Sequence, residues 1–296
     1  GAVAEAEAPS AKDVVARRKR SEVVVGVLKE VAPAGFASET RVCATPDTVG
    51  ALAKEGARIV VQSGAGDASG FSDAAYTEAG AEIVGSAADV AGAASVVYAI
   101  NFSTVPETGL RKGATVISLV NPTKSQDKVD ALKAQGINLM ALDLLPRMLS
   151  RAQAFDVLSS MANIAGYRAV VEAQGLFQRF FQAQTTAAGS QRPAKVLVIG
   201  AGVAGLAAIQ QAKAQGATVR AFDVRQTCRE QVEAVGGEFL VVPGFEDEDG
   251  AGAGGYAKEI SQEFIEAEMA LFKRQCEEVD VVITTALIPN RPAPKL

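Results

Sequence analysis

The chain has 296 residues, of which 48% are hydrophobic and 21% charged, so it is long enough and apolar enough for two ordinary globular domains. A net charge of −5 argues against a nucleic-acid partner, because phosphate backbones are bound by basic surfaces. The three cysteines are widely spaced and histidine is absent, which excludes a disulfide framework and the usual kinds of metal site.

The first 22 residues differ in composition from the rest of the chain. They are rich in Ala and Glu and end in a basic run at residues 17–20. This composition is typical of a solvated, mobile terminus. The alternative is a segment that remains near the cleavage site of an organelle-targeting sequence, or a docking segment.

Short apolar runs alternate with helical stretches from residue 23 onward. Strands are expected at Val23–Val27, Arg58–Gln62, Glu82–Val84, Val96–Ile100, Thr115–Leu119 and Ile137–Ala141, and a helix at Thr48–Glu55. Strands that alternate with helices indicate a parallel sheet with helices on its faces. We therefore expect a first α/β domain over residues 23–145.

A long connector follows, over residues 146–192. Residues 151–182 have the apolar spacing of one long helix, although Gly166 and Gly175 weaken it and leave a break open as an alternative. Thr185–Arg192 is a polar segment that contains glycine and is expected to be a loop.

The second domain, residues 193–296, opens with a pattern typical of a dinucleotide site. A continuous apolar strand, Val196–Ile199, runs directly into the turn Gly200-Ala201-Gly202-Val203-Ala204-Gly205, followed by an Ala-rich helix and a second strand. Gly200 permits the tight turn, Gly202 lets a pyrophosphate approach the backbone, and Gly205 lets the helix pack closely on the strand. The start of the helix then offers N–H groups and the positive end of its dipole to the phosphates.

An acidic residue, Asp223, follows the second strand of this pattern. Its carboxylate is expected to accept hydrogen bonds from both hydroxyls of the adenosine ribose and to repel a 2′-phosphate, which favours NAD(H) over NADP(H). Arg225 tempers that preference, because an arginine near this position can serve a 2′-phosphate.

Several segments resemble one family in particular. The resemblance is densest at Ser150–Gly166, Pro193–Arg225, Gly254–Glu259 and Ile283–Pro294, and weaker at Lys29-Glu30, Glu39–Pro46 and Ser63–Gly66. By these residues the chain resembles the NAD(H)-binding soluble component, domain I or alpha subunit, of proton-translocating NAD(P) transhydrogenase, within the alanine dehydrogenase-like superfamily. The fold implied is α/β, with two Rossmann-like parallel-sheet domains joined by a long interdomain helix.

The resemblance implies a reaction and partners. The reaction is direct hydride transfer between NAD(H) on this chain and NADP(H) on a partner domain, coupled to proton translocation by a membrane subunit, and a homodimer is expected. The absence of histidine agrees with this reaction, because hydride transfer between two nicotinamides creates no proton that needs a general acid or base. It requires proximity and exclusion of water instead.

The resemblance also assigns roles to residues. The residues around the nicotinamide are Arg147, Gln153, Asp156 and Ser159. Gln153 positions the two nicotinamides, Arg147 and Asp156 pair, and Ser159 holds the carboxamide. Without the resemblance, an ordinary helix start, with Ser150 as its cap, is the better explanation of these residue types. The cofactor contacts implied are Val203 at the pyrophosphate turn, Asp223, Val224 and Arg225 at the adenosine ribose, Gly255 and Tyr256 in a mobile lid, and Leu287 at the end of a strand.

Two alternatives to this function stay open. One is a structural or binding subunit of a larger membrane assembly that kept the fold with reduced or lost activity. The other is an amino-acid dehydrogenase, for which the missing histidine is a difficulty.

The sequence also suggests a location and an unfinished second domain. Family members continue past the position of Leu296 with another strand and helix, so the second domain is expected to be incomplete at its end. The location expected is peripheral, on the soluble side of an energy-transducing membrane, with the mitochondrial matrix side or a plastid favoured over the bacterial cytoplasm.

Overall fold

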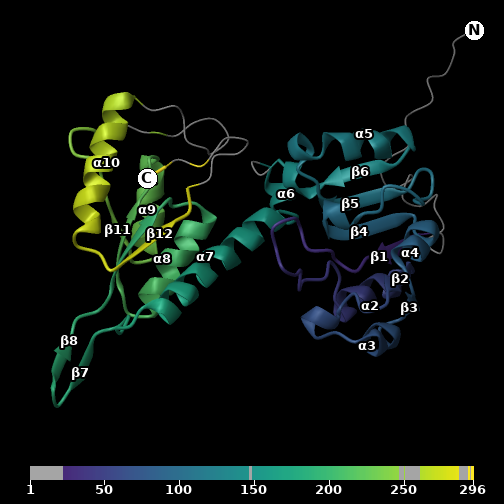
Figure 1. Cartoon of the computed structure of the whole chain (residues 1–296), viewed down its shortest axis with the longest axis horizontal. Coiled ribbons are helices and arrows are strands. Elements are labelled where there is room, and N and C mark those ends of the chain that lie inside the picture. The colour runs from purple at the N-terminus through teal and green to yellow at the C-terminus, as the bar shows by residue number, and fades with distance from the viewer. Residues whose placement is uncertain (1–22, 147–148, 247–249, 251–260, 287–292, 294) are drawn as a thin grey trace, which may run out of the picture. The chain divides into compact units, whose positions relative to one another are not determined.

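The computed structural model describes residues 23–146, 149–246, 250, 261–286, 293, 295 and 296. Contacts divide the chain into two compact units between residues 146 and 147, and each unit has its own parallel sheet (Figure 1). The structure confirms the expected α/β fold. In the described part of the chain, no helix has both the length and the apolarity needed to cross a membrane.

The first unit is built on a six-stranded sheet in the order β3-β2-β1-β4-β5-β6, and all its pairs are parallel. The strands are β1 Val24–Val27, β2 Arg58–Gln62, β3 Ala81–Val84, β4 Val96–Asn101, β5 Thr115–Leu119 and β6 Asn138–Ala141. β2 and β5 have the expected bounds, and each of the others differs from its expected range by one residue at one end. Because β2 and β3 lie on one side of β1 and β4–β6 on the other, the strand order reverses between β1 and β4.

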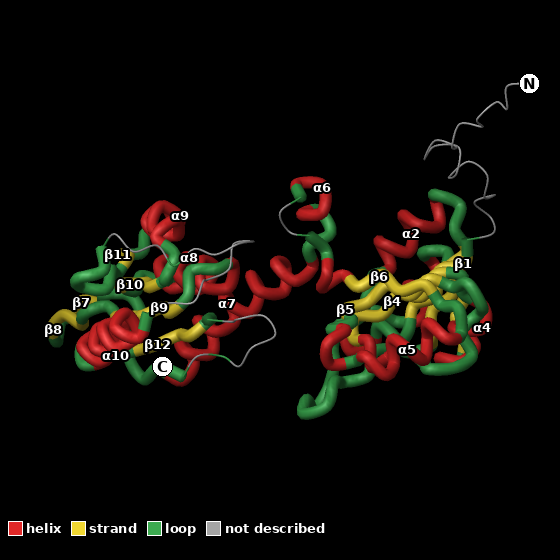
Figure 2. Tube along the Cα trace, turned by 90° about the horizontal axis from the view of Figure 1, so that it is seen from above, coloured by secondary structure: helices red, strands yellow, loops and turns green. Residues whose placement is uncertain are grey.

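Helices cover both faces of this sheet (Figure 2). They are α2 Pro46–Lys54, α3 Asp73–Glu78, α4 Ala87–Ala93 and α5 Gln126–Ala134, with short 3₁₀ turns at Asp67–Ser69, Phe102–Thr104, Pro122–Lys124 and Leu142–Leu144. Successive side chains of a strand point to opposite faces. Accordingly, Val25 and Val27 lie in a core with residues of α2 and α3, whereas Val24 and Leu28 lie in a core with residues of α4 and α5.

The second unit contains a four-stranded parallel sheet in the order β11-β10-β9-β12. Its strands are β9 Lys195–Ile199, β10 Thr218–Phe222, β11 Glu238–Phe239 and β12 Val281–Thr284, and its helices are α6 Ser150–Gln153, α7 Val157–Leu176, α8 Val203–Ala214, α9 Arg229–Ala234 and α10 Gln262–Cys276, with a 3₁₀ turn at Gln226–Cys228. The central strand β9 is buried on both faces. Val196 and Val198 face the core with α7 and α8, and Leu197 and Ile199 face the core with α10.

The expected single helix over residues 151–182 is wrong. The chain forms two helices, α6 and α7, separated at residues 154–156, because the side chain of Asp156 accepts a hydrogen bond from the Ser159 N–H and starts α7 as its N-cap. The second helix ends at Leu176. Phe177 and Phe181 then form an edge-to-face ring pair, with centroids 5.6 Å apart, and pack into the core of the second unit.

The expected loop at residues 185–192 is also wrong. It is a small antiparallel hairpin, β7 Gln184–Thr186 with β8 Gly189–Gln191. Gly189 has φ of +125°, a conformation that favours glycine and allows the tight reversal. The cross-strand contact between the hydroxyls of Thr185 and Ser190, 3.1 Å apart, supports the pairing. The polar composition had indicated a loop because both strands are largely exposed.

Helix α7 crosses α8 at a point where only glycine fits. A Cβ on Gly166 would lie 1.9 Å from the carbonyl oxygen of Ala204, a backbone atom in the first turn of α8. Four residues later, Val170 is fully buried in the core beneath the crossing. The glycine that weakens the helix in isolation is therefore the residue that lets two helices approach to backbone contact.

We predict that Gly166→Ala destabilises the second unit by about 3 kcal/mol or more, because neither backbone can move away without breaking the crossing. The matched control is Gly175→Ala, in the same helix, where an added Cβ meets nothing within 4 Å. That variant should be neutral or more stable by up to about 1 kcal/mol, because alanine is the better helix former. Urea unfolding of both variants measures the difference, and equal stabilities would contradict the crossing.

Candidate functional site

The turn between β9 and α8 is held by backbone packing that glycine alone permits. Gly200 has φ of +99°, and a Cβ on it would lie 2.6 Å from Oγ1 of Thr285. A Cβ on Gly205 would lie 1.8 Å from the carbonyl oxygen of Gly200. Two of the three glycines in the predicted motif are therefore required by the fold itself, whether or not a ligand binds.

The remaining glycine of the motif, Gly202, is different. It is the N-cap residue of α8, with φ of −75°, and an added Cβ would meet no atom of the described residues within 4 Å. As a glycine, this N-cap residue has no side chain to accept a hydrogen bond, and the first N–H groups of a helix have no acceptor within the helix itself. Open space in front of uncapped N–H groups is the arrangement that binds a phosphate.

Asp223 lies at the tip of β10, beside this turn. Its side chain is only 7% exposed, and its Oδ2 accepts a hydrogen bond of 2.7 Å from the N–H of Ala201, the residue between Gly200 and Gly202. Burial raises the pKa of this carboxyl, but the hydrogen bonds from Arg225 and from the Ala201 N–H outweigh burial and hold the pKa below its usual value. The carboxylate is thus ionised at neutral pH and fixed against the glycine turn.

Two further segments reach the same edge of the sheet. Thr285, just past β12, donates its hydroxyl to the carbonyl of Gly200 at 3.0 Å. Gly250 donates its N–H to the carbonyl of Val224 at 2.8 Å, and a Cβ on Gly250 would lie 2.7 Å from that oxygen. The loop predicted to be a lid is therefore anchored beside Asp223 at its one described residue after Glu246. The predicted lid residues Gly255 and Tyr256, and the predicted strand-end residue Leu287, lie outside the described residues.

The residues expected around the nicotinamide share one short segment of the second unit. Gln153 ends α6, and its carbonyl accepts the N–H of Asp156 at 3.2 Å. Oδ1 of Asp156 accepts the Ser159 N–H at 3.0 Å, and Oδ2 accepts the Ser159 hydroxyl at 2.5 Å. The structure brings these three residues together, with Asp156 and Ser159 forming a helix cap. Arg147, the fourth, lies outside the described residues, so its pairing with Asp156 stays a prediction.

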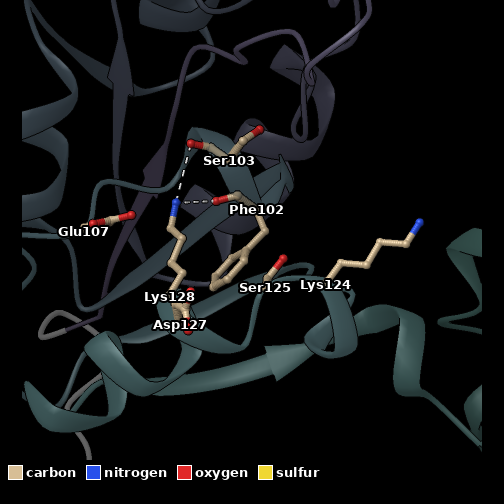
Figure 3. A pocket seen from close by; sticks show the side chains of 7 residues that line it. All are labelled: Phe102, Ser103, Glu107, Lys124, Ser125, Asp127 and Lys128. Atoms are coloured by element: carbon tan, nitrogen blue, oxygen red, sulfur yellow. Dashed lines mark hydrogen bonds between the residues drawn. The ribbon is translucent and has the colours of Figure 1, made fainter.

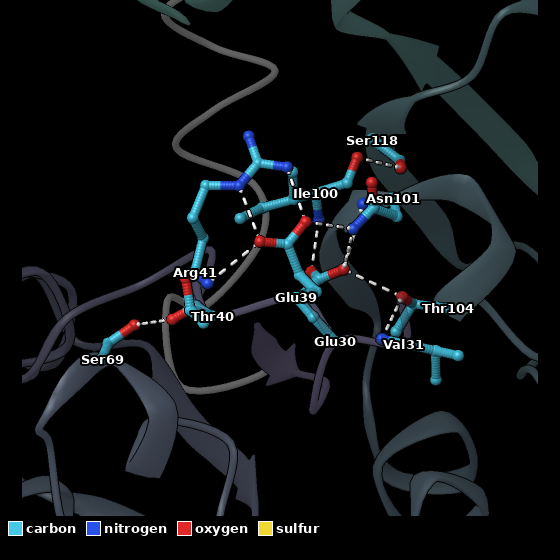
Figure 4. Close-up of polar contacts among 10 residues, drawn as sticks. All are labelled: Glu30, Val31, Glu39, Thr40, Arg41, Ser69, Ile100, Asn101, Thr104 and Ser118. Atoms are coloured by element: carbon cyan, nitrogen blue, oxygen red, sulfur yellow. Dashed lines mark hydrogen bonds and ion pairs between the residues drawn. The ribbon is translucent and has the colours of Figure 1, made fainter. Parts of the chain in front are cut away.

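The first unit holds a polar network that was not among the expected site residues (Figure 4). Glu30, just past β1, accepts hydrogen bonds from the backbone N–H groups of Ile100 and Asn101 and from the hydroxyl of Thr104. Glu39 is bound by Arg41, at 2.8 Å and 2.6 Å, and by the Asn101 side chain at 2.9 Å. The network joins the ends of β1 and β4, where the strand order reverses.

All three weakly matching segments of the first domain meet here. They line a cavity of about 100 Å³ formed by Lys29, Glu30, Glu39, Arg41, Gly64, Ala65, Asp67 and Ala68. The spacing of these segments in sequence gave no sign of their proximity. Because the carboxylates of Glu30 and Glu39 already accept hydrogen bonds from the chain's own donors, the network stabilises the strand ends.

A larger surface hollow of about 450 Å³ lies beside α5, lined by Phe102, Ser103, Glu107, Lys124, Ser125, Asp127 and Lys128 (Figure 3). Lys128 donates to the carbonyls of Phe102, at 2.8 Å, and of Val105, at 2.5 Å, and its ammonium lies 4.9 Å from the centre of the Phe102 ring. Burial lowers the pKa of Lys128. The lysine thereby closes the turn after β4, which is a structural role.

Comparison with known proteins identifies relatives along nearly the whole chain. Residues 26–165 match the family model of the alanine dehydrogenase/PNT N-terminal domain, and residues 169–296 match that of the C-terminal domain. The chain is 49% identical over 273 residues to NAD(P) transhydrogenase subunit alpha of Cereibacter sphaeroides, covering 92% of this chain and 51% of that protein. It is 46% identical over 275 residues to NAD(P) transhydrogenase subunit alpha of Haemophilus influenzae, covering 93% of this chain and 52% of that protein.

Solved structures agree with these sequence matches. The crystal structure of transhydrogenase from Sinorhizobium meliloti aligns with a TM-score of 0.77 and 38% identity, over 92% of this chain and 72% of that one. A structure of L-alanine dehydrogenase aligns with a TM-score of 0.60 and 22% identity, over 74% of this chain and 61% of that one, and shares the fold. The chain spans about half the length of the Cereibacter and Haemophilus relatives. The Cereibacter, Haemophilus and Sinorhizobium proteins are bacterial, so the expected organelle location gains no support.

The three glycines of the motif should respond differently to alanine. We predict that Gly202→Ala leaves the thermal unfolding temperature within about 2 °C but weakens NADH binding at least tenfold, because its Cβ occupies the space facing the uncapped N–H groups. Gly205→Ala should lower the unfolding temperature strongly, because its Cβ overlaps the Gly200 carbonyl. Calorimetric titration and thermal unfolding separate the two effects, and undiminished NADH binding by Gly202→Ala would refute the phosphate role.

The first-unit network should contribute pH-dependent stability. The hydrogen bond from Arg41 lowers the pKa of Glu39 to about 2, from an ordinary value of 4.5. A depressed folded-state pKa stabilises the fold above pH 4.5, and that contribution is lost as the pH falls from about 4.5 towards 2. Glu39→Gln should therefore cost about 2 kcal/mol at pH 7 and progressively less below pH 4. Urea unfolding at pH 7 and pH 3 checks this, and a cost that is independent of pH would contradict it.

Proposed function

The chain belongs to the alanine dehydrogenase/PNT family, with NAD(P) transhydrogenase alpha subunits among its relatives, and from that membership we propose that it is the NAD(H)-binding component of an NAD(P) transhydrogenase. Its reaction is direct hydride transfer between NAD(H) on this chain and NADP(H) on a partner domain, coupled to proton translocation by a membrane subunit. The observation that carries the proposal is the open, uncapped helix start at Gly202 beside the buried carboxylate of Asp223.

The chemistry of this site fits a dinucleotide in two respects. Backbone N–H groups at the start of α8, including that of Val203, have no acceptor within the helix, and together with the space at Gly202 they suit a pyrophosphate. Asp223 supplies a fixed negative charge that suits ribose hydroxyls and disfavours a 2′-phosphate, which is the preference expected for NAD(H). Val224 and Arg225 follow directly and border the adenosine end of the site.

The protein's part in hydride transfer is to orient and to exclude water. When bound, NAD(H) supplies the hydride or accepts it. Gln153 ends α6 directly before the Asp156 cap, and in the proposal it orients the facing nicotinamide of the partner. Asp156 and Ser159 hold the start of α7 in place. In the proposal, Ser159 also binds the carboxamide of the nicotinamide. The chain has no histidine, and the step has no proton for one to carry.

The assay that tests the proposal joins this chain to the NADP(H)-binding domain of a transhydrogenase. NADPH should reduce a spectroscopically distinct analogue of NAD⁺ only when both proteins are present. Failure of this chain to bind NADH in a calorimetric titration would refute the proposal at its base. NADH binding without transfer would favour a subunit that kept the fold and lost the activity. Reductive amination of pyruvate, with ammonia as the nitrogen source and NADH as the reductant, would favour an amino-acid dehydrogenase.

The predicted role of Gln153 can be separated from a structural one. Gln153→Ala should lower the rate of hydride transfer about a hundredfold, because misplaced nicotinamides lose their reacting geometry, and should leave the NADH dissociation constant within twofold. The control is Ser150→Ala, an exposed position of the same short helix with no proposed role, which should leave both the rate and the thermal unfolding temperature unchanged. Single-turnover kinetics of the Gln153 variant measure the effect, and an unchanged rate would remove Gln153 from the mechanism.

A further inference from the structure

The carboxylate of Asp223 is fully engaged by donors of its own chain. Oδ2 accepts from the Ala201 N–H at 2.7 Å and from Nη2 of Arg225 at 2.8 Å. Oδ1 accepts from the backbone N–H of Arg225 at 3.0 Å and from its Nε at 2.8 Å. A carboxylate offers about four acceptor positions, and these four bonds occupy them.

The four donors fall into two pairs with different freedom to move. The two backbone N–H groups belong to the glycine turn and to the chain just past β10, and they remain in place while the fold is intact. The other two belong to one guanidinium, on a side chain that is 21% exposed and ends a flexible stem. A ribose diol also presents two hydroxyl donors side by side, so the guanidinium fills the positions that a diol would take.

We propose that Arg225 competes with the adenosine ribose for Asp223 and thereby sets the nucleotide affinity of this site. This rests on the proposed function, because it concerns the same NAD(H) site. Binding of the ribose requires the guanidinium to leave Asp223 and turn towards solvent. The free energy needed to separate the guanidinium from Asp223 weakens ribose binding by the same amount. This holds for any site in which only a fraction of the molecules has the conformation that binds. Arg225 is therefore a determinant of affinity and of exchange rate.

The surroundings of the pair favour this competition over a purely structural ion pair. The Ala201 and Arg225 backbone bonds keep the buried carboxylate partly satisfied when the guanidinium leaves, so opening does not strand a bare charge. Gly250 packs on Val224, which lies between the two members of the pair in the sequence.

The test compares NADH binding by the wild-type chain, Arg225→Met, Arg225→Lys and a control, Arg229→Met. Arg229 lies four residues away and bonds to Gln226 and to the Phe239 ring, so its removal takes one positive charge from the same segment without touching Asp223. If the open form is about a tenth of the wild-type population, Arg225→Met binds NADH about tenfold more tightly. Arg225→Lys, with fewer matched donors, falls in between, and Arg229→Met matches the wild type.

Two further readouts exclude a structural explanation. Arg225→Met should lower the unfolding temperature measured without NADH and should raise the affinity for NADH. If Arg225 only supported the fold, its replacement would lower both the unfolding temperature and the affinity. An NADH analogue with 2′-deoxyadenosine, which has one ribose hydroxyl fewer, should gain less from the substitution than NADH does. If Arg225→Met fails to fold, Arg225→Lys carries the same comparison.

The outcomes separate this proposal from the function on which it rests. NADH binding by Arg225→Met that equals or falls below wild-type binding overturns the competition and leaves the transhydrogenase proposal standing. Absence of NADH binding in the wild-type chain overturns the proposed function itself.

Discussion

The site depends on backbone contacts that no side chain could share. A Cβ at Gly205 would lie 1.8 Å from the Gly200 carbonyl, and one at Gly166 would lie 1.9 Å from the Ala204 carbonyl. At these two glycines, the backbones of β9, α8 and α7 pack closely against one another around one turn. Gly200 and Gly205 are in close contact with neighbouring atoms. The third glycine of the motif, Gly202, is the N-cap residue of α8, and a Cβ on it would meet no described atom within 4 Å. The packing that holds the fold thus leaves space at Gly202, where we propose that a phosphate binds.

The charge of Asp223 ties a second strand, β10, to the same turn. Asp223 joins the tip of β10 to the turn through the Ala201 N–H, so the carboxylate that we propose binds the ribose also links two strands. Its partner Arg225 keeps the buried charge balanced in the nucleotide-free chain. In the proposed function, the groups that bind the nucleotide also hold the fold, so we expect the nucleotide affinity to respond to an ion pair within the protein.

Much of this could be predicted because local pattern determines it. The strands β2 and β5 are short, largely apolar runs rich in β-branched residues, and the structure gives them the bounds that the sequence predicted. The break before α7 was missed because it depends on one side chain, Asp156, capping a helix that apolar spacing alone would continue. The close crossing at Gly166, the bonds between Asp223 and Arg225, and the Glu30 network join residues distant in sequence or depend on side-chain geometry, which periodicity does not encode. The roles proposed for Arg147, Gly255, Tyr256 and Leu287 rest on family resemblance.

The central claim is that NAD(H) binds at the turn between β9 and α8, with its phosphates on the N–H groups at the start of α8. Backbone amide chemical shifts report directly on those N–H groups. Titration of the isotope-labelled chain with NADH should shift the amide signals of Ala201–Gly205 and of Asp223–Arg225 most, and leave those of the first unit's Glu30 network nearly unchanged. Largest shifts in the first unit, or none at the glycine turn, would contradict the account.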